Sequence, residues 1–111
     1  MHTLPEMTNA SFHTEVLASQ VPVLVDFWAP WCAPCRVLAP QVARVALENK
    51  STLYVVAVDA EAVPQIAETY SVRNLPTLIV FVGGKEVARK VGAAGGYAAI
   101  VQLVQPFLCA P

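Results

Sequence analysis

The sequence predicts an α/β fold in which helices cover both faces of a mixed β-sheet. Two apolar segments, residues 23–27 and 53–58, are continuous rather than alternating, which is typical of buried parallel strands. A helical pattern separates them, so they form a strand–helix–strand crossover. A third apolar segment, residues 77–82, is followed by Gly83-Gly84 and residues 85–91, which is the signal of a hairpin.

The first helix and a short strand are predicted near the N-terminus. Thr8 or Asn9 can cap a helix that carries Phe12, Val16 and Leu17 on one face. Residues 2–4 could form a short edge strand that Pro5 ends.

Three further helices complete the predicted fold. One spans about residues 34–49 and contains Pro40, which should kink it. A short helix spans residues 64–70. Gly95-Gly96 precede the last helix, over residues 97–108, whose apolar positions suit packing on a sheet. This order places a site beyond the carboxyl end of the first strand.

The composition limits the classes of function. The 111 residues suit one domain, residues 1–111, and only 14% are charged against roughly 25% in typical domains. Part of the surface is therefore expected to be apolar. A net charge of −1 without a basic run argues against nucleic acid as a partner. No apolar run approaches the ~18 residues of a membrane span, and the N-terminus lacks a signal pattern. We expect a monomeric, cytoplasmic protein, although an exported form with a trimmed signal would look similar.

Trp31-Cys32-Ala33-Pro34-Cys35 is the most informative motif. It follows the first strand and opens a helix, where free backbone N–H groups and the helix dipole stabilise a thiolate. Cys32 should be the exposed attacking thiolate and Cys35, one turn inside the helix, the shielded resolving thiol. The motif therefore predicts thiol–disulfide exchange. Two alternatives are a zinc half-site, which would need two more ligands, and a purely structural disulfide.

Asp26 and Cys109 are the other chemically notable residues. Asp26 lies within the apolar first strand, so we expect it to be buried and to accept and return the proton of Cys35. A solvent-facing strand position is the alternative. Cys109 is expected to be an inert terminal thiol, with an intermolecular disulfide as the alternative.

Three segments resemble the thioredoxin family. Residues 26–35 are similar to its active-site segment, residues 75–77 to its cis-proline loop, and residues 83–85 with 91–93 to its hairpin and the strand that follows. The resemblance covers roughly residues 8–108. It implies the thioredoxin fold and the reduction of protein disulfides through a Cys32–Cys35 redox disulfide, with neither a bound cofactor nor a metal. It also implies an NADPH-dependent flavoprotein, a thioredoxin reductase, as electron donor.

The same resemblance implies a docking surface around the disulfide. Pro76 would follow a cis peptide packed against the disulfide, and the backbone near Leu75 would bind an extended substrate segment. Trp31 would be exposed beside Cys32. Gly92 would keep this surface open because it has no side chain; the alternative is that it is needed only for a turn of the backbone. Supporting positions are Trp28, as a packing residue, and Pro34, in the first helical turn.

The chain departs from the family pattern at three positions. Ala33 replaces the usual glycine between the cysteines, Ala57 stands where the family often has a lysine near the buried aspartate, and Asn74 replaces a glycine before the cis-proline loop. Asn74 can still adopt a positive φ. Two other functions remain open: a thioredoxin-fold binding subunit, and an oxidase or isomerase with electrons flowing the opposite way.

Overall fold

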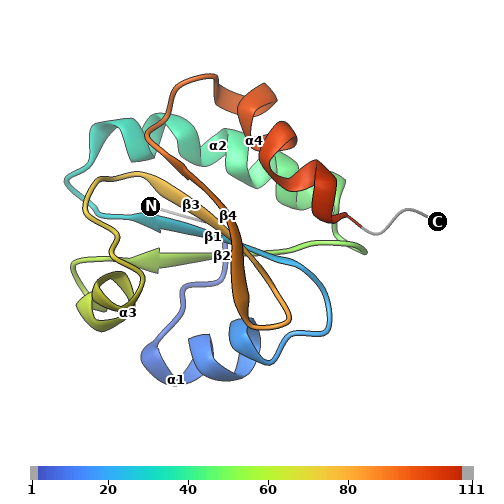
Figure 1. Ribbon diagram of the computed structural model, residues 1–111. Coiled ribbons are helices and arrows are strands. Elements are labelled where there is room, and N and C mark those ends of the chain that lie inside the picture. The colour runs from blue at the N-terminus through green and yellow to red at the C-terminus, as the bar shows by residue number, and fades with distance from the viewer. Residues whose placement is uncertain (1–2, 109–111) are drawn as a thin grey trace.

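The computed structural model describes residues 3–108, and it confirms a mixed sheet between two layers of helices (Figure 1). The sheet has four strands in the order β2-β1-β3-β4. The β1 strand runs parallel to β2 and antiparallel to β3, and β4 is antiparallel to β3. The strands are β1 (Val23–Trp28), β2 (Tyr54–Asp59), β3 (Thr77–Val82) and β4 (Lys85–Val91).

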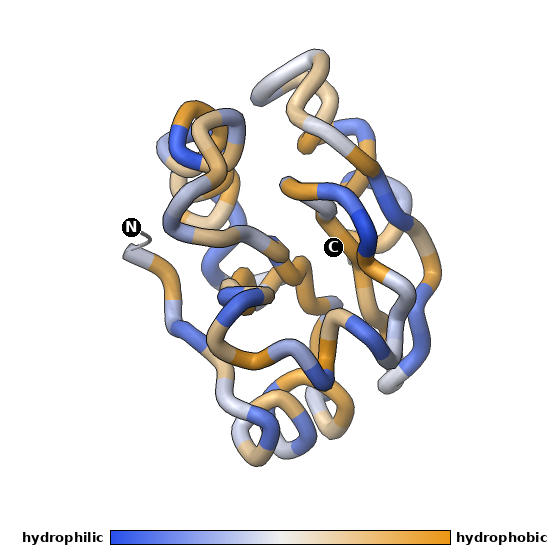
Figure 2. Tube along the Cα trace, turned by 90° about the vertical axis from the view of Figure 1, so that its left-hand side faces the viewer, coloured by the Kyte–Doolittle hydropathy of each residue, from blue (hydrophilic) through white to orange (hydrophobic). Residues whose placement is uncertain are grey.

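The helices lie on opposite faces of this sheet. In Figure 1, α2 and α4 lie above the sheet, while α1 and α3 lie below it. Figure 2 gives the view from the side and shows hydrophobic positions in the helices as well as in the strands. The upper layer contains α2 (Ala33–Glu48), α4 (Gly96–Val104) and the 3₁₀ turn η2 (Gln105–Phe107); the lower layer contains α1 (Asn9–Phe12), the π-helix η1 (His13–Leu17) and α3 (Pro64–Thr69).

Each face of the sheet has its own hydrophobic core, because alternate residues of a strand point to opposite faces. Leu24 and Trp28 of β1 join the core beneath α2 and α4, which also contains both cysteines of the motif. Val23, Val25 and Phe27 join the core of the lower layer. All six residues of β1 are buried, so the strand that leads into the motif is held from both sides.

The lower layer agrees with the sequence prediction apart from one helical irregularity. Thr8 caps α1, as its side chain accepts a hydrogen bond from the N–H of Ser11. Phe12 and Val16 are buried, and Leu17 packs against the lower core. The helix continues beyond Phe12 as a π-helix rather than as an α-helix.

The structure corrects both ends of the predicted fold. Residues 3 and 4 form a bend rather than a strand, while Glu6, after the proline, makes a single bridge to Ala57. His2 lies outside the described residues. The last α-helix ends at Val104, because Pro106 has no N–H with which to continue it. Pro40 lies inside α2, which is continuous through it, and the expected kink stays a prediction.

The two edges of the sheet differ. At the β2 edge, the N–H of Ala57 donates to the carbonyl of Pro5 and the N–H of Met7 donates to the carbonyl of Ala57, both at 2.9 Å. At the other edge, β4 is mostly exposed and carries four charged side chains: Lys85, Glu86, Arg89 and Lys90.

Candidate functional site

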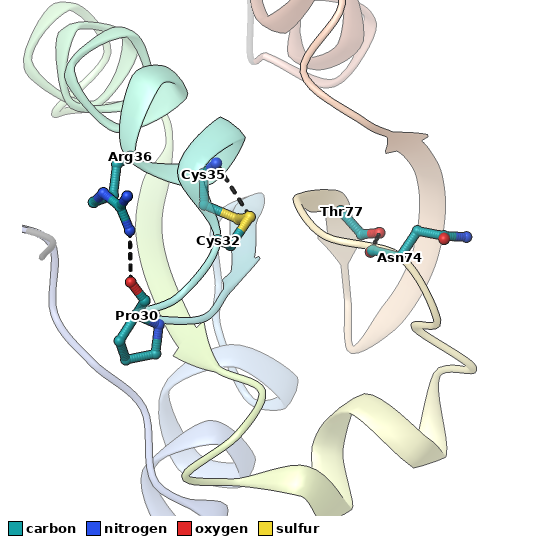
Figure 3. Close-up of a disulfide and its surroundings, with 6 residues drawn as sticks. All are labelled: Pro30, Cys32, Cys35, Arg36, Asn74 and Thr77. Atoms are coloured by element: carbon teal, nitrogen blue, oxygen red, sulfur yellow. Dashed lines mark hydrogen bonds between the residues drawn. A yellow bond between two sulfur atoms is a disulfide. The ribbon is translucent and has the colours of Figure 1, made fainter.

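A disulfide joins Cys32 and Cys35 at the start of α2, directly beyond the carboxyl end of β1 (Figure 3). Cys32 is the N-cap of the helix. Its Sγ accepts a hydrogen bond from the backbone N–H of Cys35 at 3.2 Å. Helix N-termini offer such N–H groups to negative charge. A thiolate at Cys32 would therefore meet a donor that is already in place.

The expected exposure of Cys32 is wrong for this oxidised form. Cys32 is 4% exposed and Cys35 is 1% exposed, and both belong to the core beneath α2 and α4. The reason is that the disulfide lies against this core, while the neighbouring Trp31 extends into solvent with 66% exposure. Cys32 is still the more accessible of the two.

Asp26 is buried, as the sequence predicts, with 1% exposure. It lies between Leu24 and Trp28 on β1, and these two residues belong to the core that holds both cysteines. Alternation along the strand therefore places Asp26 on the disulfide side of the sheet. Its neighbours across the sheet are Ala57 on β2 and Leu78 on β3. The residue that replaces the family's lysine thus lies next to this carboxyl group.

The loop before β3 faces the disulfide. The Leu75–Pro76 peptide bond is cis, in agreement with the resemblance. The hydroxyl of Thr77 donates to the carbonyl of Asn74 at 2.6 Å, and Figure 3 shows this pair across from the disulfide. Leu75 packs against the core that contains the cysteines.

Asn74 does not use the positive φ that it could adopt. Among residues 3–108, Ser71 is the only residue other than glycine with a positive φ. Ser71 follows the end of α3, where the N–H groups of Ser71 and Val72 donate to carbonyls of the helix.

Gly92 lies beside the cis-proline loop. Its N–H donates to the carbonyl of Pro76 at 2.8 Å. Its φ is +88°, and a Cβ at this position would have no heavy atom within 4 Å. The positive φ alone is a reason for glycine at this position, because other residues rarely adopt it. The open space around the position is what a docking surface requires. Both interpretations of Gly92 are therefore compatible with the geometry.

Trp28 and Trp31 have different environments. Trp28 is 7% exposed, and its indole Nε1 donates to Glu6 Oε1 at 3.3 Å. Trp31 is on the surface beside the disulfide. Pro34 lies in the first turn of α2 and is exposed. These are the packing, surface and helix-start positions that the sequence predicts.

Three charged residues contact segments near the site, and sequence patterns alone do not identify them. Glu6 bonds to Trp28, as described above. Arg36 Nη1 donates to the carbonyl of Pro30 at 2.7 Å and thereby holds the segment before Cys32 (Figure 3). Lys90 Nζ donates to the carbonyl of Gly92 at 3.3 Å. Of these three residues, only Arg36 has a signal in the sequence that points to the site, because it directly follows Cys35.

Side-chain contacts between α2 and α4 fix the helix that carries the dithiol. Gln41 Oε1 accepts a hydrogen bond from the N–H of Tyr97 at 2.6 Å. The Tyr97 hydroxyl donates to Glu48, and the Arg44 guanidinium lies 3.7 Å from the centre of the Tyr97 ring. Hydrogen bonds from Tyr97 and then Arg44 lower the pKa of Glu48. The two helices are therefore joined through Tyr97, in the first turn of α4.

Two features are absent from the described residues: a metal-binding cluster and a membrane-spanning helix. Residues 3–108 contain no group of three or more His, Cys, Asp or Glu side chains arranged to hold a metal ion. No helix in this range has the length and hydrophobicity needed to cross a membrane. Cys109 lies outside the described residues.

Comparison with known proteins gives consistent matches. The family model described as Thioredoxin matches residues 3–105. Thioredoxin 1 of Nostoc sp. is 47% identical over 93 residues, 84% of this chain and 87% of that protein. The chloroplastic M-type thioredoxin of Chlamydomonas reinhardtii is 47% identical over 102 residues, 92% and 72% of the two chains. The bifunctional thioredoxin reductase/thioredoxin of Mycobacterium leprae is 47% identical over 90 residues, 81% of this chain and 20% of that protein.

Proposed function

The chain belongs to the thioredoxin family, and on that premise we propose the roles by which its individual residues reduce protein disulfides. The protein is a thiol–disulfide oxidoreductase whose Cys32–Cys35 dithiol carries the electrons. The hydrogen bond from the Cys35 N–H to Cys32 Sγ is the observation that carries the assignment. It gives Cys32, rather than Cys35, a donor at the helix N-terminus.

In the first step, the Cys32 thiolate attacks one sulfur of a substrate disulfide. A bond forms between Cys32 Sγ and that sulfur, and the other substrate sulfur leaves as a thiolate. The position of Cys32 as N-cap supports this role, because a helix N-terminus favours the thiolate. The greater exposure of Cys32 also supports it.

In the second step, Cys35 gives up its proton and attacks Cys32 Sγ. The Cys32–Cys35 disulfide forms, the second substrate thiolate is released, and two electrons have passed to the substrate. The two sulfurs are held together at the start of one helix, so this step is intramolecular and fast. Asp26 acts as the proton acceptor. Its burial on the disulfide side of β1 supports this assignment.

The docking surface consists of Trp31, Leu75, Pro76 and Gly92. Trp31 contributes an exposed aromatic surface beside Cys32. The cis-proline loop and Gly92 are joined by a backbone hydrogen bond, so they form one wall opposite α2. An extended substrate segment lies between this wall and Trp31.

The oxidised protein is returned to the dithiol by a thioredoxin reductase, a flavoprotein that takes electrons from NADPH. One relative is named as a reductase and a thioredoxin in the same chain, which supports this class of partner. We assign the cycle to the cytoplasm, where a reducing environment keeps such dithiols active. Coupled NADPH oxidation with a purified reductase tests the partner, and cell fractionation tests the location.

Trapping the mixed disulfide tests the roles of the cysteines. In a Cys109→Ala background, Cys35→Ser should accumulate an adduct with a disulfide-containing protein substrate such as intact insulin. Cys32→Ser should form no adduct and show no turnover. The parent Cys109→Ala protein, which should retain turnover, is the control. Adducts with Cys32→Ser and none with Cys35→Ser would reverse the two roles.

The reduction potential tests the direction of electron flow. Equilibration with glutathione should give a value near that of thioredoxins, about −270 mV, rather than the value of about −120 mV typical of a dedicated oxidant. The Ala33→Gly variant, which restores the family dipeptide, provides the matched comparison. A potential in the oxidant range would contradict a reducing role.

A further inference from the structure

The outer face of α2 carries an apolar stripe that leads away from the disulfide. Positions spaced by three or four residues lie on one line along a helix. On α2 these exposed positions form what we call the α2 stripe: Ala33, Val37, Pro40, Arg44 and Leu47. Val37 is 69% exposed and Leu47 is 70% exposed. At a rise of 1.5 Å per residue, the stripe is about 20 Å long.

The stripe is additional to the core-facing side of α2. The buried side is formed by Cys35, Leu38, Val42 and Val45. A surface helix usually has a polar face opposite its apolar face, whereas α2 is largely apolar on both. Its two large exposed aliphatic side chains, Val37 and Leu47, lie ten positions apart on one line, with Pro40 and Arg44 between them.

Arg44, the one charged member of the stripe, is held to the side. Its guanidinium lies over the Tyr97 ring at 3.7 Å, and its Nε donates to Glu48 Oε2 at 3.1 Å. The charge is therefore directed toward α4. The Arg44 side chain is 59% exposed, so its aliphatic part is open to contact with an apolar partner.

A hollow of about 290 Å³ runs beside the stripe. Its lining residues are Thr3, Arg36, Ala39, Pro40 and Ala43, so it lies between α2 and the N-terminal segment. Alanine and proline form most of this lining. Arg36, the residue after Cys35 in the sequence, lines the hollow, and the hollow can receive an aliphatic side chain from a segment that lies along the stripe.

We propose that the α2 stripe and this hollow bind an aliphatic segment of the same protein that presents the disulfide to be reduced. The inference rests on the proposed function. The stripe begins at exposed Ala33, between the two reacting cysteines and two positions after exposed Trp31. A chain attached to Cys32 is therefore already at its end. At ~3.3 Å per residue, an extended segment of about six or seven residues spans it.

Disulfide peptides with different tails test the proposal. Two disulfide peptides each carry one seven-residue tail rich in leucine and valine, placed before the attacked cysteine in one peptide and after it in the other. Two matched peptides carry tails of serine and glycine at the same positions. With the wild-type protein, we expect one of the two aliphatic peptides to have a kcat/KM roughly threefold to tenfold higher than its serine- and glycine-tailed counterpart. Val37→Ser and Leu47→Gln, singly and together, should remove this advantage.

Matched controls separate the stripe from the dithiol. Val21 and Val87 are 40% and 42% exposed and lie outside α2. Val21→Ser and Val87→Ser should keep the full advantage of the aliphatic tail. The rate with oxidised glutathione, which is too small to reach Leu47, should be unchanged in every variant. Circular dichroism confirms that each variant is folded.

Three results would overturn the proposal. The first is no advantage of either aliphatic tail with the wild-type protein, and the second is an advantage that persists in the Val37 and Leu47 variants. The third is a wild-type dimer in sedimentation experiments that these variants dissociate, which would assign the stripe to a second copy of the chain. Failure to reduce even the serine-tailed peptides would instead contradict the proposed function.

Discussion

Reduction of the Cys32–Cys35 disulfide should lower the free energy of unfolding. The size of the effect depends on the small ring of residues that the disulfide closes. The cysteines are separated by three positions, so the disulfide closes a ring of four residues. The chain-entropy relation gives about 6 cal/mol/K for such a ring, or about 2 kcal/mol at 25 °C. In the folded protein Cys32 is the N-cap of α2 and Cys35 lies in its first turn, so the helix already holds the two residues close together and the constraint acts mainly on the unfolded chain.

Urea unfolding of the oxidised and reduced protein measures this difference. With a typical m-value of about 2 kcal/mol/M, the midpoint should be about 1 M lower in the reduced protein. By the thermodynamic cycle, the folded protein should also have a reduction potential about 40 mV below that of the unfolded chain. A Cys32→Ser/Cys35→Ser double variant should unfold at the same midpoint with and without reductant.

Equal midpoints for the two redox forms would refute this reasoning. So would a reduced form that is the more stable of the two. Either result would mean that rearrangement of the folded site on reduction outweighs the entropy of the ring. Disagreement between the difference in unfolding free energy and the difference in potential would show that unfolding is not two-state.

Three further predictions concern single side chains. Asp26→Asn should keep the shape of the site and slow decay of the mixed disulfide roughly tenfold or more; an unchanged decay rate in rapid-quench mass spectrometry would remove Asp26 as proton acceptor. Burial and the hydrogen bond to Glu15 raise the pKa of Tyr54 to about 12 from 10.0, which favours its neutral form in the folded state. Stability from this shift is complete below pH 10 and is lost as pH rises through about 12, so Tyr54→Phe should flatten the fall in urea midpoint over this interval. Gln41→Ala should cost about 1 kcal/mol by removing the acceptor for the Tyr97 N–H, while exposed Gln102→Ala should stay within about 0.5 kcal/mol of wild type.

Local sequence signals account for most of the elements. The hairpin is confirmed with its predicted bounds, because Gly83 and Gly84 both have a positive φ and so fix the turn. The strand that leads to Cys32 was recognisable because it is buried on both faces and therefore continuously apolar. The disulfide follows from the spacing of Cys32 and Cys35, and the burial of Asp26 follows from its apolar neighbours on β1.

The remaining features depend on contacts between distant segments. The bond from Trp28 to Glu6 joins residues 22 positions apart, and the bond from Tyr97 to Gln41 joins residues 56 apart. No spacing rule connects such pairs. Its position at the start of the helix predicts that Cys32 is exposed, whereas its burial is decided by packing against the core beneath α2 and α4.

The cover on the β2 edge has a consequence for aggregation. An unpaired strand edge is a template for pairing with another chain, and charged side chains on an edge discourage this pairing. The β4 edge has such charges, but β2 reads Tyr-Val-Val-Ala-Val-Asp and has one charge at its end. Residues 5–7 occupy the middle of this edge through the two hydrogen bonds to Ala57. Proteolytic removal of this short segment would uncover the backbone N–H and C=O groups of a valine-rich edge and leave them open to pairing with another chain.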